Sequence, residues 1–205
     1  MTKKADGWLV YTDISAIVAD DVHGFAQKDM IVLHETVSGD VPGTADLLAN
    51  AKYLDNAGLG VQGLTDADGN VALAKSYEDA ILYHAASTGS KGEGHINTRS
   101  IGIEQVSRVM IDLKDNDSRW ERWMGRAKEI EATARLVAYL SHKHGIPLRY
   151  SDAKHPGVTT HWQVSQTFGV YGGHTDCWPR HLGGYYPALR VIYRARQIRK
   201  KRYGH

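Results

Sequence analysis

The sequence predicts an α/β fold in which a mixed central β-sheet carries helices on its faces. Apolar segments of strand length alternate along the chain with longer segments of helical periodicity, and a hairpin turn lies between two short apolar runs. This alternation is typical of sheets with parallel neighbours, whereas a hairpin requires an antiparallel pair. The 205 residues are 42% hydrophobic, which is enough for one globular core.

The first 34 residues contain one strong strand signal. We expect residues 1–7 to be a loose tail and residues 14–25 to form a short helix or loop. Residues 29–34, Asp-Met-Ile-Val-Leu-His, are apolar and β-branched. They predict a buried strand that ends in a histidine.

The next segments predict a helix and then a hairpin. Residues 44–56 have apolar side chains at helical spacing, with Thr44 as the N-cap and a glycine just past the end. The turn at 65–70 separates two short apolar runs and predicts a β-hairpin. We expect residues 80–84 to form another short strand and the Gly- and Ser-rich residues 85–96 to form a loop.

The second half predicts a further buried strand and a long helix. Residues 97–99 are a polar loop leading into a strand at 100–106, where Gly102 indicates a close backbone approach. Residues 107–118 are expected to be a charged excursion. Residues 119–144 show the clearest helical periodicity in the chain.

Charge is nearly balanced overall but unevenly placed. The formal charge of +2 does not favour a nucleic-acid partner, yet residues 190–202 carry seven Arg or Lys and no acid. We therefore divide the chain into a catalytic domain, residues 1–185, and a basic C-terminal helix or tail, residues 186–205. The apolar side of that helix is predicted to contain Leu189, Ile192, Tyr193 and Ile198. The charged block predicts a solvated helix face, with contact to an anionic polymer as the alternative.

The sequence also limits the compartment in which the protein is made. A single cysteine, Cys177, excludes an intrachain disulfide. Residues 1–15 lack the apolar core of a signal peptide, and no apolar run approaches the roughly 20 residues of a membrane span. We expect a monomer that is made in a cytoplasm and has no membrane span.

Histidine and carboxylate side chains at predicted strand ends and turns form a candidate metal site. His34 ends a buried strand, His161 follows a predicted turn at 157–160, and Asp176 lies in a loop rich in turn-forming residues. Zinc prefers imidazole, carboxylate and thiolate ligands, and a catalytic site leaves one position open for water. Two histidines and one aspartate would satisfy that requirement, although spacing alone does not select this set.

Four segments of the chain resemble, in the same order, four motifs of one protein family. They are residues 31–36, residues 83–85, residues 97–104, and the late segment that contains a histidine and the aspartate at 176. The family is that of zinc-dependent N-acetylmuramoyl-L-alanine amidases of type 2, which includes phage endolysins and peptidoglycan-recognition proteins. The segment at 97–104 is similar to the family's Asn-x-x-Ser-Ile-Gly-Ile-Glu, and the resemblance covers about residues 30–179. It implies the fold of these amidases and hydrolysis of the amide between N-acetylmuramic acid and the L-alanine of the stem peptide.

By position, the resemblance implies Zn²⁺ as the cofactor and His34, His161 and Asp176 as its ligands. Cys177 is a rival third ligand, because Asp-Cys-Trp-Pro replaces the family's Asp-Pro-Gly and thiolate binds zinc well. We favour Asp176, since its spacing from the preceding histidine matches the family's Lys-x-Asp. His155 is a less favoured alternative to His161.

The resemblance also implies catalytic and substrate-binding roles. Glu104 is expected to orient or deprotonate the attacking water, and His174 stands where the family usually has a lysine that stabilises the oxyanion. His84 and Asn97 are expected to line the groove for glycan and peptide, with a structural role as the alternative for His84. Val61-Gln62 replaces the family's Tyr-His or Ala-His pair, so catalysis cannot be assisted by a tyrosine at that position and depends more on Glu104.

These inferences predict a peptidoglycan hydrolase. We expect a phage endolysin that stays in the host cytoplasm until holin-type release gives it access to the cell wall; a cytoplasmic amidase that recycles wall fragments is a close variant. The alternative is a non-catalytic peptidoglycan-binding module of the same fold, which a complete ligand set disfavours. Nucleic-acid binding through residues 190–202 is disfavoured by the small total charge.

Overall fold

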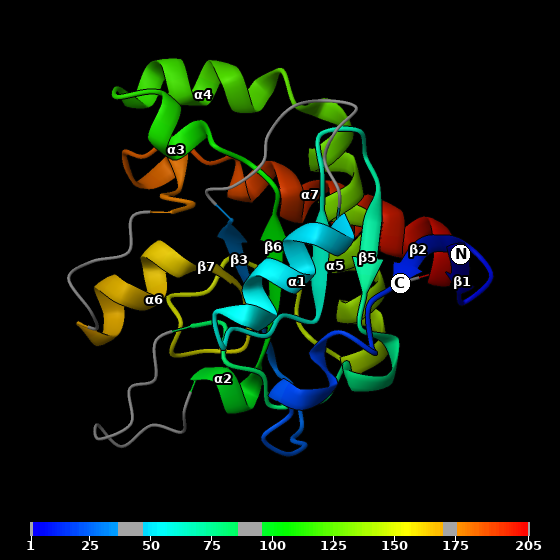
Figure 1. The fold of residues 1–205 in the computed structure, drawn as a ribbon. Coiled ribbons are helices and arrows are strands. Elements are labelled where there is room, and N and C mark those ends of the chain that lie inside the picture. The colour runs from blue at the N-terminus through cyan, green and yellow to red at the C-terminus, as the bar shows by residue number, and fades with distance from the viewer. Residues whose placement is uncertain (1, 37–46, 86–95, 170–175, 205) are drawn as a thin grey trace.

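A mixed β-sheet forms the centre of the computed structural model (Figure 1), which describes residues 2–36, 47–85, 96–169 and 176–204. Within these residues the sheet has seven strands in the order β1-β2-β5-β4-β6-β3-β7. The predicted class, a mixed sheet flanked by helices, is confirmed. The expected N-cap Thr44 and the expected catalytic residue His174 lie outside the described residues.

The strand directions divide the sheet into an antiparallel part and a parallel part. The β1–β2 and β4–β5 pairs are antiparallel, whereas β2–β5, β4–β6, β6–β3 and β3–β7 are parallel. The strands are β1 (Thr2–Ala5), β2 (Leu9–Asp13), β3 (Met30–Glu35), β4 (Gly63–Thr65), β5 (Val71–Leu73), β6 (Ser100–Gln105) and β7 (Gly157–Thr160). The hairpin predicted around residues 65–70 is thus confirmed as β4–β5.

Helices cover both faces of the sheet. Figure 1 shows α5 and α7 behind the sheet and α1 in front of it. The α-helices are α1 (Leu47–Asn56), α2 (Ile96–Arg99), α3 (Val109–Asp112), α4 (Asn116–Met124), α5 (Ala127–His144), α6 (His161–Phe168) and α7 (Ala188–Tyr203). In the described part of the chain, no helix is long and apolar enough to cross a membrane.

Alternate residues of β3 face different cores. Ile31 and Leu33 join the large core cluster formed with α5 and α7, whereas Met30 and Val32 join a smaller cluster with Val164 of α6. Side chains alternate along a strand. The side chain of His34, two positions after Val32, therefore lies on the α6 face of the sheet, and that of the next residue lies on the α5 face.

Two predictions for the N-terminal half are wrong. Residues 1–7 are no loose tail, because Thr2–Ala5 forms β1 and pairs with β2. Its exposed lysines give this segment no apolar pattern, so the sequence does not predict the strand. Charges are common on edge strands, however, because they prevent the edge from pairing with strands of other molecules. Residues 80–84 form no strand, and only a single bridge joins Phe25 to Ala80. Residues 14–25 contain a short 3₁₀ helix, Val18–Asp21, as expected.

The helix predicted at 119–144 is two helices. Its first part belongs to α4, which begins earlier, at Asn116, and is closed by Gly125; α5 begins two residues later. Between them, Arg126 donates to the carbonyl of Val106 and pairs with Glu129, which fixes the break against the sheet. The expected charged excursion at 107–118 contains α3 and the start of α4, and residues 97–99 lie in the helical turn α2.

The segment before His161 also differs from its prediction. Residues 157–160 form the edge strand β7 and not a turn, and α6 follows at once. The Thr160 hydroxyl accepts a hydrogen bond from the Gln163 backbone N–H at 3.3 Å, so it caps α6. The glycine and polar side chains of this segment hid both elements in the sequence.

The C-terminal helix α7 packs on α5 with a different apolar face from the one predicted. Ile192 and Ile198 are buried as expected, but Leu189 and Tyr193 are 49% and 62% exposed. Several of its cations are tied to the protein. Arg194 pairs with Glu131, Arg196 donates to the Leu148 carbonyl, and Arg199 donates to the Ser141 hydroxyl.

The end of α7 meets the start of the chain. The Trp8 indole N–H donates to the Tyr203 hydroxyl at 3.0 Å, and this hydroxyl donates to Asp6 at 2.9 Å. Figure 1 shows the C-terminal end of α7 at the β1 edge of the sheet.

A buried lysine holds the helical turn α2. Lys28 is 1% exposed, and its ammonium group donates to the carbonyls of Asn97 at 3.2 Å and Thr98 at 2.9 Å. Burial lowers the pKa of Lys28 from 10.5 to about 8.

We expect this lysine to make the protein more stable as the pH rises from about 8 to 10.5. In this range the folded state has released the Lys28 proton while the unfolded state keeps it, so the free energy of unfolding increases with pH. The pKa difference corresponds to on the order of 3 kcal/mol. Urea unfolding across this range should show the increase in the wild type and lack it in Lys28→Met; equal pH dependence in both proteins would contradict the prediction.

Candidate metal centre

Three buried side chains from distant parts of the chain converge at one end of the parallel strands. The His34 and His161 Nδ1 atoms are 3.1 Å apart, and Asp176 carboxylate oxygens lie 3.2 Å from His161 Nδ1 and 3.8 Å from His34 Nδ1. One ligand atom from each residue lies within 4.8 Å of the others. These are the three residues that the sequence proposes as metal ligands, and that role stays a prediction.

The sheet places the two histidines. β3 and β7 are parallel neighbours, with Leu33 opposite Thr160, so the residues that follow these positions emerge at the same edge. His34 is the next residue of β3, and His161 begins α6 directly after β7. Parallel pairing therefore brings together residues that are 127 positions apart.

Backbone contacts fix the position of Asp176 and of the residue that follows it. The Trp162 N–H donates to the Asp176 carbonyl at 3.2 Å, and the Glu35 N–H donates to its carboxylate at 3.4 Å. The next residue, Cys177, has a left-handed backbone with φ of 56°, and its N–H donates to the Tyr185 hydroxyl at 3.2 Å. These bonds orient the Asp176 carboxylate toward the histidines.

Glu104 lies beside the three converging side chains. It is the direct partner of His34 in the β3–β6 pairing, and its Oε1 is 3.9 Å from His34 Nδ1. Its other oxygen, Oε2, is buried and has no hydrogen-bond partner in the described part of the protein. Burial raises the pKa of Glu104 well above its usual range, and repulsion from Asp176 and Glu35 adds to the effect.

These residues fit a divalent cation. Two carboxylates and two imidazoles lie close together and are buried, and an unpaired buried carboxylate oxygen is costly unless a cation or water meets it. A dication would be neutralised by Asp176 and Glu104 together. Two histidines and one aspartate leave a fourth tetrahedral position open, which is the pattern of catalytic zinc.

The two alternative ligands lie elsewhere. Cys177 is fully buried in the large core, its thiol contacts Gln105 Nε2 at 3.6 Å, and burial raises its thiol pKa well above the usual range. His155 is 71% exposed and pairs with Asp152 at 3.0 Å. Neither belongs to the cluster of converging ligand atoms in the described residues.

His84 is a neighbour of the centre and is almost fully enclosed. Its Nδ1 is 3.0 Å from His34 Nε2 and its Nε2 is 3.1 Å from the Ser100 hydroxyl, so both ring nitrogens have protein partners. The residue is 5% exposed. Burial lowers the pKa of its imidazole from 6.5 to about 3, helped by Lys28 and His161.

Asn97 is buried at 1% exposure, with both ends of its amide bonded to backbone. Its oxygen accepts from the His84 N–H at 3.3 Å and the Ala85 N–H at 2.8 Å, and its nitrogen donates to the Ala85 carbonyl at 2.7 Å. These contacts give Asn97 a structural role, and its expected contact with substrate stays a prediction.

Glu35 and Tyr185 form a brace that sequence reasoning missed. The Glu35 carboxylate accepts from the Ser107 hydroxyl, the Met110 N–H and the Tyr185 hydroxyl at 2.9, 2.8 and 3.1 Å. The same Tyr185 hydroxyl accepts from the N–H that follows Asp176. The sequence did contain a signal for this brace. Glu35 directly follows His34 in a buried strand, so its carboxylate must point to the opposite face, where it needs hydrogen-bond donors.

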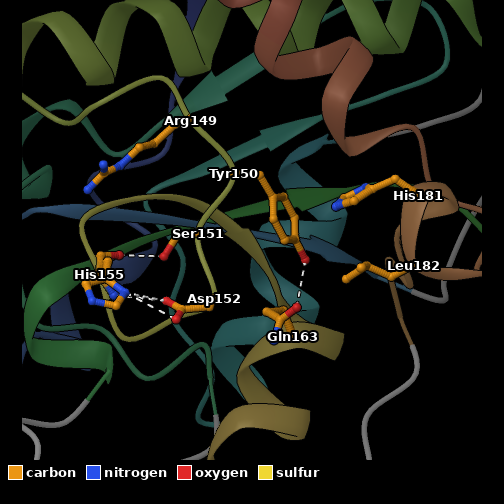
Figure 2. Close-up of a pocket in the computed structure, with 8 residues that line it drawn as sticks. All are labelled: Arg149, Tyr150, Ser151, Asp152, His155, Gln163, His181 and Leu182. Atoms are coloured by element: carbon orange, nitrogen blue, oxygen red, sulfur yellow. Dashed lines mark hydrogen bonds and ion pairs between the residues drawn. The ribbon is translucent and has the colours of Figure 1, made fainter.

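A cavity of about 590 Å³ lies beside α6 and contains none of the converging residues. Figure 2 shows it between residues 149–155, α6 and residues 181–182, with the Tyr150 hydroxyl and Gln163 joined across it at 3.2 Å. The exposed pair of Asp152 and His155 lies on its rim. Gln163 is two residues from His161, so α6 connects this cavity to the metal centre.

The sequence comparison identifies the family. Residues 25–180 match the family model described as N-acetylmuramoyl-L-alanine amidase. The chain belongs to this amidase family. The match covers well over half of the chain and confirms the family that the motifs indicate. No curated protein sequence matches the chain significantly.

Solved structures agree with the fold of these amidases. The Staphylococcus aureus hydrolase AmiA, in complex with its ligand, has a TM-score of 0.58 and 18% identity over 87% of this chain and 80% of that chain. A mutant of the protein PlyL has a TM-score of 0.53 and 14% identity over 90% of this chain and 94% of that chain. The PlyG catalytic domain has a TM-score of 0.52 and 15% identity over 92% of each chain. At these identities the likeness shows the fold alone.

Removing the Tyr185 hydroxyl should destabilise the amidase fold. Tyr185→Phe leaves the buried Glu35 carboxylate without one donor and the Cys177 N–H without its acceptor. An unsatisfied buried polar group costs about 1–3 kcal/mol, so we expect a loss of this size in urea unfolding. Tyr193→Phe is the control, because Tyr193 is 62% exposed. Equal stability of the two variants would contradict the role of the brace.

Proposed function

We propose that the protein is a zinc-dependent amidase that hydrolyses the bond between N-acetylmuramic acid and L-alanine in peptidoglycan. The observation that carries this proposal is the convergence of His34, His161 and Asp176 beside the unpaired oxygen of Glu104. Membership of the amidase family supports the substrate class. The donor set supports a metal-dependent reaction.

His34, His161 and Asp176 would hold the metal. When bound, Zn²⁺ supplies Lewis acidity, which polarises a carbonyl and lowers the pKa of water to about 7. The three protein ligands come from β3, the start of α6 and the loop at 176, so each is anchored by a different element. This anchoring keeps the ligand atoms in place before substrate binds.

Glu104 is the proposed proton carrier of the reaction. Its buried Oε2, which has no hydrogen-bond partner among the described residues, can accept the proton of the attacking water. The proton then passes to the amide nitrogen as the bond between carbonyl carbon and nitrogen breaks. The products are the lactyl carboxylate of muramic acid and the free amino group of L-alanine. His174 stays the proposed oxyanion-stabilising residue.

The proposed cellular role is that of a phage endolysin. The protein would remain in the host cytoplasm until a holin-type hole gives it access to the wall, where it acts as a monomer. Expression in the host without a holin should leave growth unchanged, and expression with one should cause lysis. Lysis that needs no holin would contradict this role without affecting the proposed chemistry.

Purified protein should cleave peptidoglycan at one kind of bond. We expect mass spectrometry to detect new L-alanine amino termini and intact glycan strands, with activity lost after chelation and restored by Zn²⁺. New reducing sugar ends, or cleavage within the stem peptide, would contradict the amide assignment. Zinc binding without any cleavage would favour a peptidoglycan-binding module.

Substitutions should separate metal binding from proton transfer. Glu104→Gln should keep zinc binding and lower kcat/KM by about 10²–10⁴-fold, because general acid–base catalysis typically accelerates a reaction by a factor of this size. Asp176→Ala should weaken zinc binding measured by chelator competition, whereas Cys177→Ala should retain it. Loss of zinc binding in Cys177→Ala but not in Asp176→Ala would assign the third ligand to the thiolate.

A further inference from the structure

We propose that His84 is a positioning residue that holds the His34 ring in its metal-binding orientation. The segment from Asn97 to Gly102 forms the socket that holds His84. This inference rests on the proposed metal-binding function of His34. It changes the roles expected for His84 and Asn97, because both act through another residue and not on substrate.

A single hydrogen-bonded chain runs away from the metal centre. His34 Nδ1 faces His161 and Asp176, whereas His34 Nε2 lies 3.0 Å from His84 Nδ1. The other nitrogen of His84 lies 3.1 Å from the Ser100 hydroxyl, and that hydroxyl donates to the Ile96 carbonyl. The chain therefore ends on a backbone acceptor.

The Ile96 carbonyl at the end of this chain determines which atom donates and which accepts in each hydrogen bond. A hydroxyl has one proton, and the Ser100 proton goes to a carbonyl, so the Ser100 oxygen accepts from His84 Nε2–H. With one ring proton, His84 then accepts at Nδ1, and the His34 ring must donate from Nε2. The lone pair of His34 Nδ1 consequently points toward His161 and Asp176, where a metal ligand is needed.

The socket leaves no freedom for the His84 ring. A Cβ at Gly102 would lie 2.5 Å from His84 Cγ and 2.8 Å from Cδ2, so only glycine lets the ring pack against β6. Asn97 binds the backbone of His84 and Ala85 on both sides. Ser100 and Gly102 thus contact the His84 ring, whereas Asn97 holds its backbone.

The size of the effect follows from the role. Partners that orient metal-ligating histidines typically change metal affinity by about 10–100-fold when they are removed. His84→Leu introduces an apolar side chain of similar bulk and removes the acceptor for His34. His84→Asn places an amide oxygen near the position of Nδ1, so it retains that acceptor.

The test measures zinc affinity by chelator competition on the full chain, separately from cleavage of peptidoglycan. We expect His84→Leu to bind zinc about 10–100-fold more weakly than wild type and His84→Asn to recover most of that loss. Ser100→Ala should give a smaller loss, because it breaks the chain one step further away. His155→Leu is the matched control and should bind zinc like wild type, since His155 is 71% exposed. Urea unfolding with chelator present checks that each metal-free variant is folded.

Several results would overturn the inference. Wild-type zinc affinity in a folded His84→Leu that has lost cleavage would make His84 a substrate contact. Equal losses in the Leu and Asn variants would mean that the ring only fills space. If wild-type protein binds zinc but cleaves no peptidoglycan, the proposed function fails while the affinity pattern still supports positioning. If wild-type protein binds no zinc, both proposals fail.

Discussion

Parallel pairing of β3 with β6 on one side and β7 on the other is the constraint on which the candidate metal centre depends. The register sets His34 opposite Glu104 and Leu33 opposite Thr160, so the proposed base and both histidines reach the same edge of the sheet. A slip of one residue would turn His34 to the opposite face, because side chains alternate along a strand. Ile31 and Leu33, buried against α5 and α7, oppose that slip through the hydrophobic cost of exposing them.

The same alternation gives two adjacent residues different tasks. The His34 side chain meets the other candidate ligands, whereas the Glu35 side chain points to the opposite face of the sheet and accepts a hydrogen bond from the Tyr185 hydroxyl. The Tyr185 hydroxyl in turn receives the backbone N–H next to Asp176. The third candidate ligand is therefore positioned from the opposite face of the sheet. Tyr185 thus helps to position Asp176 through its hydroxyl, although it is not itself a candidate ligand.

The parts of the fold that could be predicted from sequence are those with strong periodicity. β3, the β4–β5 hairpin and most of α5 have it, whereas β1 is short and rich in lysine, and β7 and α6 follow a glycine in a polar segment. Family motifs, and not spacing, selected the candidate ligands. The positions of His84 and Asn97 were visible in those motifs, but their contacts were not. A hydrogen-bond partner 50 residues away depends on tertiary packing that local patterns do not encode.

The meeting of Trp8 and Tyr203 has a practical consequence for engineering. Both chain ends lie at the β1 edge of the sheet, and β2, β5, β4 and β6 separate that edge from β3. A cargo domain fused beside β1 would be separated from the candidate ligand His34 by these four intervening strands.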